Sequence, residues 1–104
     1  MKLSNTETIA NQTITQNLGI ARGSTVRSRN IGRDIFASLK NIVGGEIEEY
    51  TKLQADAREQ ALKRMISDAQ RLGADAVVNV RFTTSVVAQG ASEMLAYGTA
   101  VKLK

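Results

Sequence analysis

The feature that most constrains the fold is one long apolar stripe between residues 46 and 72. Its members recur at spacings of three and four residues, which is the pattern of an α-helix with one buried face. Acidic residues occupy the first turn and Arg71 the last, as the helix dipole favours, and Gly73 follows as a typical C-terminal cap. The pattern predicts a helix over residues 46–72, about 40 Å long. The stripe consists of Ile47, Tyr50, Leu53, Ala57, Ala61, Met65, Ala69 and Leu72.

Three further segments have patterns typical of β-strands. Residues 13–26 mix apolar residues with threonines, and we expect this strand to bend or bulge at Gly19 or Gly23. Residues 74–87 alternate with a period of two, which places the even-numbered residues from Ala76 to Val86 on one face. Residues 93–104 form the third strand after a short turn. This last strand has no charged residue between Met94 and Val101.

A shorter amphipathic segment precedes the long helix. Residues 29–45 carry isoleucine and leucine at helical spacing, which predicts a short extra helix that ends at Gly44 and Gly45. We interpret this glycine pair as a turn and not as a phosphate cradle, because it follows a helix and is itself followed by acids, which would repel a phosphate. Residues 1–12 are polar and aperiodic, and they predict a flexible N-terminal arm before a single domain of residues 13–104.

Together these elements predict an α+β fold, a β-α-β-β subunit with a short extra helix. The expected sheet is antiparallel and three-stranded, with the long helix packed on it. One helix covers only one face of a sheet, whereas the last strand is apolar on both sides. Leaving its large side chains in water would forgo about 1.5–3 kcal/mol each. The sequence therefore predicts a homo-oligomer in which further copies of the chain cover these side chains.

The chain contains no Cys and no His, which removes several chemistries. Thiol nucleophiles, Ser-His-Asp triads and nearly all structural zinc sites need one of these residues. We therefore predict a protein that is not an enzyme and has no cofactor; the alternative is a carboxylate-based site between subunits. The N-terminus has no secretory h-region, and no stretch has the ~18 consecutive apolar residues of a membrane span. These features predict a cytoplasmic protein without membrane contact.

A basic cluster lies between residues 22 and 33. Arg22, Arg27, Arg29 and Arg33 fall within twelve residues that include no acid, in a chain of net charge +4. This cluster supports an alternative function, the binding of nucleic acid or another anionic ligand. Aromatic residues make up only 4% of the chain and none is interleaved with these arginines, so the sequence predicts that nucleic acid is not the partner.

Three segments of this chain resemble a known family. "NIGRDIFASLKNIVGGEIEEY", "AREQALKRMISDAQRLGADAVVNV" and "YGTAV" are similar to the YbjQ-like family, also named the "putative heavy-metal-binding domain" family, over residues 18–101. The resemblance implies a dodecin-like subunit, assembled as a ring-shaped homopentamer without established activity. Its retained motif residues are candidates for ligand or inter-subunit contacts. They are Arg33, Asp34, Gly44, Gly45, Glu49 and Tyr50.

The family name implies a metal, but this chain departs from the family pattern where metal ligands would lie. Members often carry acids near the first strand's glycines and along the second strand. Because those acids are missing and no Cys or His is present, we predict no metal site in this chain, although metal binding stays the alternative that the name implies. The residues at these positions are Gln16, Ser24, Arg81, Thr83 and Ser85.

Overall fold

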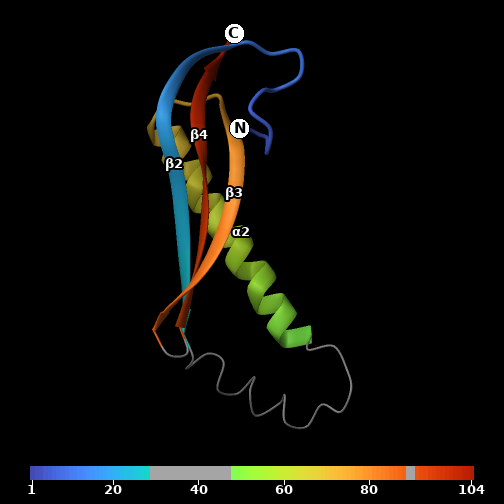
Figure 1. The fold of residues 1–104 in the computed structure, drawn as a ribbon, viewed down its shortest axis with the longest axis vertical. Coiled ribbons are helices and arrows are strands. Elements are labelled where there is room, and N and C mark those ends of the chain that lie inside the picture. Colours follow the sequence, from blue (N-terminus) through green and yellow to red (C-terminus); the bar gives the residue numbers. More distant parts are fainter. Residues whose placement is uncertain (29–47, 89–90) are drawn as a thin grey trace.

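A computed structural model of the chain describes residues 1–28, 48–88 and 91–104. The described strands form one sheet in the order β1-β3-β4-β2, and helix α2 lies across one side of it (Figure 1). The predicted short helix of residues 29–45 lies outside the described residues. The elements are β1 (Lys2–Leu3), β2 (Ile14–Ser28), α2 (Glu48–Arg71), β3 (Ala76–Ala88) and β4 (Ala91–Leu103).

The sheet has four strands, so the prediction of three antiparallel strands is wrong in number and in type. Strand β1 pairs with β3 in parallel, with Lys2 opposite Ala76. The backbone N–H of Ser4 donates to the carbonyl of Val77 at 3.0 Å, and Ser4 accepts from Val80 at 2.9 Å. A strand of two residues is too short to show an alternating pattern, so it could not be recognised in a polar N-terminal segment.

Helix α2 confirms the predicted long helix, of which residues 46 and 47 lie outside the described part. Figure 1 shows its C-terminal half against the sheet and its N-terminal end apart from the strands. The residues at the contact are mostly small, which lets the helix approach the strands closely. They are Ala57, Ala61, Met65 and Ala69 on α2, and Ala21, Ala96 and Ala100 on β2 and β4.

Strand β2 confirms the predicted bulge at a glycine. Its register against β4 shifts between Asn17 and Gly19, and Gly19 has φ +109°, a conformation that residues with a Cβ rarely adopt. Gly23, the other candidate, lies in regular register opposite Ala96.

Strand β3 contains a second bulge, which overturns part of the predicted face assignment. The register shifts between Val78 and Arg81, and Asn79 has φ 55°. An extra residue in a strand switches its alternation, so even-numbered residues before and after the bulge face opposite sides. Ala76 and Val78 pack on the side of the sheet opposite α2, whereas Val80 packs against the core under α2. The open face is defined here as the side of the sheet opposite α2.

The N-terminal segment covers one end of the open face. Ile9 and Ile14 pack there against Ala76, Val78 and Val101, which are buried. The prediction that one chain leaves the last strand exposed is therefore wrong at this end of β4, where the same chain covers both of its sides. The exposed large apolar residues of the long strands lie elsewhere: Ile20 and Val26 on β2, Phe82, Val86 and Val87 on β3, and Tyr97 on β4.

Candidate functional site

The edge strand β2 is joined tightly to α2 at Gly23. A Cβ built on Gly23 would lie 2.2 Å from the backbone N of Met65 and 2.4 Å from the carbonyl O of Ala61. Only glycine leaves room for the helix backbone at this distance. The contact sets the distance between the backbones of α2 and β2 at this point.

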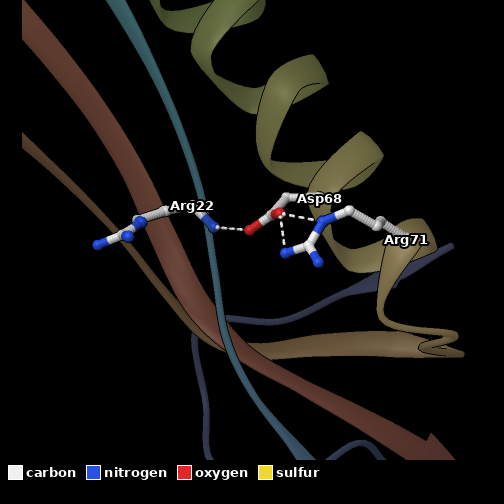
Figure 2. Close-up of polar contacts among 3 residues, drawn as sticks. All are labelled: Arg22, Asp68 and Arg71. Atoms are coloured by element: carbon white, nitrogen blue, oxygen red, sulfur yellow. Dashed lines mark hydrogen bonds and ion pairs between the residues drawn. The ribbon is translucent and has the colours of Figure 1, made fainter.

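Two side chains of α2 bind backbone groups of β2 on either side of this contact. One oxygen of Asp68, Oδ2, accepts a hydrogen bond from the backbone N–H of Arg22 at 3.0 Å, and the other, Oδ1, forms an ion pair with Arg71 at 2.8 Å (Figure 2). Arg64 donates to the carbonyl of Ser24 at 2.6 Å. Hydrogen bonds from the Arg22 backbone and then from the Arg71 side chain lower the pKa of Asp68 below 3.8. These contacts use backbone groups that an edge strand would otherwise offer to another strand.

The same contacts show how Arg22 is oriented. Its N–H points outward to α2, so Arg22 and its partner Tyr97 on β4 form a non-hydrogen-bonded pair, in which side chains lie closest. The side chain of Arg22 is exposed and points away from Asp68 and Arg71 (Figure 2). Strand β4 also pairs with β3, and in that pairing Tyr97 is opposite Arg81.

Arg22, Tyr97 and Arg81 therefore form a row across three adjacent strands on the open face, which we name the Arg–Tyr–Arg row. All three residues are exposed, Tyr97 to 37%. Arg81 is fixed by hydrogen bonds from its Nη1 to the carbonyls of Asn5 at 2.8 Å and Val80 at 3.0 Å. The row combines two cations with an aromatic ring and is the most distinctive polar group on this face.

A separate apolar surface lies on the α2 side of β3. Phe82 and Thr84 are opposite Ala96 and Met94, whose side chains belong to the core under α2. Helix α2 packs chiefly against β2 and β4 and reaches β3 at Val77 and Val80, so the rest of β3 extends beyond its cover. Phe82 is 46% exposed and Val86 is 79% exposed. We name Phe82, Thr84 and Val86 the β3 strip.

The residues predicted as sites are only partly described. Of the predicted anion-binding group, Arg22 lies in the row above and Arg27 lies in β2 opposite Ser92, with its side chain outside the described part. Glu49 and Tyr50 belong to the first turn of α2, and their side chains are likewise outside it. Their roles stay predictions. Outside the described residues altogether are Arg29, Arg33, Asp34, Gly44 and Gly45.

Sequence reasoning missed Tyr97 and Arg81 as site residues. They are separated from Arg22 by most of the chain, and only the strand register brings the three together. It also missed Asp68 and Arg64, which read as ordinary surface charges of an amphipathic helix. The signal in the sequence was an aromatic residue, Tyr97, within a segment without charged residues from Met94 to Val101.

The donor set does not fit a soft metal ion. The chain has no Cys or His, and no group of three or more acids lies together in residues 1–28, 48–88 and 91–104. The absence of a metal site nevertheless stays a prediction. Within the same ranges no helix is long and apolar enough to cross a bilayer, and cytoplasmic localisation stays a prediction as well.

The fold defines a class: small α+β proteins with one helix packed on a four-stranded mixed sheet. A crystal structure of a protein of unknown function from Pediococcus pentosaceus, of the DUF74 family, superposes with a TM-score of 0.65 and covers 100% of this chain and 98% of that chain. At 15% sequence identity this likeness shows the fold alone.

The sequence comparison defines the family. The family model YbjQ_1, described as "Putative heavy-metal-binding", matches residues 1–104. The chain is 58% identical over 104 residues to a UPF0145 protein of Halorubrum lacusprofundi, with both chains covered completely. It is 59% identical over 102 residues to a UPF0145 protein of Archaeoglobus fulgidus, covering 98% of this chain and 94% of that one. The chain belongs to this uncharacterised YbjQ family, which confirms the resemblance.

Proposed function

We propose that the protein is a homo-oligomeric, ligand-binding module without catalytic activity, in which the β3 strip is a contact between copies of the chain. The exposure of Phe82 and Val86 on the α2 side of β3 carries this proposal. Both side chains lie next to a core that α2 closes over β2, β4 and the first residues of β3, but not over Phe82 and Val86. A neighbouring copy would continue that core.

The dimensions of the chain support the same assembly. Its radius of gyration is 17.0 Å, and its extents are 55 × 25 × 16 Å. A compact domain of about 100 residues has a radius of gyration of about 13 Å. A lone chain of this elongated shape leaves large apolar side chains of its long strands exposed, and packing against copies of itself would cover them.

The free energy available at the strip is adequate for a specific contact. Burying a Phe or Val side chain fully is worth about 1.5–3 kcal/mol, so Phe82 and Val86 offer a few kcal/mol per contact once their present burial is subtracted. In a closed ring each chain presents its β3 strip to one neighbour and covers the β3 strip of the other. The free energy of this contact is therefore gained at every interface of the ring. We propose five members for the ring, as the family resemblance implies, and the cytoplasm as its location.

Size-exclusion chromatography with light scattering tests the assembly. We expect a mass of five times the 11.2-kDa chain mass. Val86→Glu should lower that mass, because it places a charge in the contact. Ser85→Glu is the matched control: the neighbouring residue lies on the open face, and the oligomer should persist. A wild-type mass of one chain, or dissociation by Ser85→Glu but not by Val86→Glu, would overturn the proposal.

A further inference from the structure

The Arg–Tyr–Arg row has the geometry of a small binding platform. Because Arg22 and Tyr97 form a non-hydrogen-bonded pair, their Cα atoms are about 4.5 Å apart. Strand β4 lies between β2 and β3, so the backbone groups of Tyr97 face Arg81 instead. Tyr97 and Arg81 therefore form a hydrogen-bonded pair, with their Cα atoms about 5.5 Å apart. The Cα atoms of the two arginines therefore lie about 10 Å from one another, on either side of Tyr97.

The charge of the row is not neutralised within the part of the chain that the structure describes. The ion pair formed there joins Asp68 to Arg71, and neither Arg22 nor Arg81 has a carboxylate partner in it. Glu93, on the same face of β4, is four residues from Tyr97, or about 13 Å along the strand. Two uncompensated guanidinium groups create a local positive potential that attracts an anion.

The neighbours of the row add hydroxyl groups and one apolar side chain. In the next row toward the hairpin of β3 and β4, Ser24, Leu95 and Thr83 lie side by side across the three strands. Arg81 is held by the carbonyls of Asn5 and Val80 at the edge of β3 next to the N-terminal segment, so its guanidinium lies on the side of β3 away from Tyr97. The surface thus offers bidentate donors for an oxyanion, a ring face for stacking and hydroxyls for a polar group.

We propose that the Arg–Tyr–Arg row binds a nucleotide unit, with the phosphate held by Arg22, the base stacked on Tyr97, and Arg81 adding to the positive potential from the far side of the ring. An exposed aromatic residue between cations on an open sheet is how single-stranded nucleic acid is commonly bound, since the base needs a ring face and the phosphate a positive charge. The sequence argument against nucleic acid was that no aromatic is interleaved with the arginines. The strand register supplies that interleaving. This proposal deepens the ligand-binding part of the proposed function.

Binding is tested on the full chain with a fluorescein-labelled octathymidylate, followed by fluorescence anisotropy at low salt, with AMP and inorganic phosphate as unlabelled competitors. We expect saturable binding that weakens as salt rises. Competition by AMP at concentrations near those of the octamer's nucleotides would identify a free nucleotide as the source; competition only by the unlabelled octamer would identify a single strand. Phosphate should compete much more weakly than AMP, since it cannot stack.

Three variants and one control decide whether the row is the site. Arg22→Gln and Tyr97→Leu should each weaken binding about tenfold, and Arg81→Gln should weaken it by a smaller factor, because it removes a positive charge that does not touch the phosphate. Arg58→Gln, an exposed arginine of α2, is the control and should change the affinity less than twofold. Equal losses in all four variants, no loss in Tyr97→Leu, or no binding of the octamer or AMP would overturn the proposal. Light scattering on each variant separates loss of binding from loss of the oligomer, and melting curves confirm that Arg81→Gln is folded.

Discussion

Replacing Gly23 by alanine is the most direct test of how α2 sits on the sheet. The new Cβ would lie 2.2 Å from the backbone N of Met65, whereas ordinary contacts begin at 3.4 Å, so the helix must retreat by about 1.2 Å. The φ angle of Gly23 is not in the left-handed region, so alanine can adopt its backbone conformation. The substitution therefore acts through the close approach alone.

The expected loss of stability is large because the obstructing atoms are backbone atoms. Overpacking that side chains can absorb costs about 1–3 kcal/mol. Here no rotamer change relieves the contact, and retreat of α2 also weakens the bonds from Asp68 to Arg22 and from Arg64 to Ser24, each worth about 1 kcal/mol or more. The reduced entropy of the unfolded chain returns about 0.4–1 kcal/mol. We expect Gly23→Ala to lower the free energy of unfolding by about 4 kcal/mol.

Urea unfolding followed by circular dichroism at 222 nm measures this loss, at one fixed protein concentration because assembly contributes to stability. Gly19→Ala is the matched control. Gly19 has φ +109° and no atom within 4 Å of a built Cβ, so its substitution should cost only backbone strain, about 1–2 kcal/mol. If Gly23→Ala proved less destabilising than Gly19→Ala, the close approach of α2 to β2 would be refuted.

Two further substitutions test polar contacts of the same core. Asp68→Asn should destabilise the fold by about 1 kcal/mol at pH 7, since it removes the charge that pairs with Arg71. Because folding lowers the pKa of Asp68 below 3.8, this contribution is present above pH 3.8 and is lost as the pH falls through the folded-state pKa. The urea midpoints of the wild type and the variant should therefore converge at low pH. Thr25→Val should raise the unfolding free energy by about 1 kcal/mol, because the Thr25 hydroxyl is buried and has no hydrogen-bond partner among the described residues. Thr84→Val is its control and should give no gain in a thermal melt, since the Thr84 hydroxyl donates to the sulfur of Met94 at 3.3 Å.

The elements with long, regular patterns could be predicted from the sequence. The stripe of α2 repeats over many turns, and the three long strands were located with small errors at their ends. The bulge at Gly19 was also predictable, because glycine is the residue that tolerates such a backbone angle. In each case the signal is local, and local signals are what a single sequence carries.

The parts that failed depend on tertiary pairing. Asn79 gives no clear sign that it adopts a left-handed φ, yet this one residue reverses the faces of the rest of β3 and brings Phe82 to the α2 side. Strand β1 is held by backbone bonds to β3 that side-chain patterns do not report. The Arg–Tyr–Arg row depends on the registers of two strand pairs at once, so no reading of spacing along the chain could bring Arg22 beside Tyr97.

The bulge at Asn79 separates the two proposed surfaces. With an unbroken alternation, Arg81 would lie on the same side as Val77, under α2, and Phe82 would lie on the open face. The observed register instead places Arg81 beside Tyr97 and Phe82 beside Ala96. The cation therefore reaches the open face and the apolar ring the side next to the helix-covered core. If the chain assembles through the β3 strip as proposed, the Arg–Tyr–Arg row stays on the opposite side of the sheet, so a ligand bound there need not compete with the contact between copies.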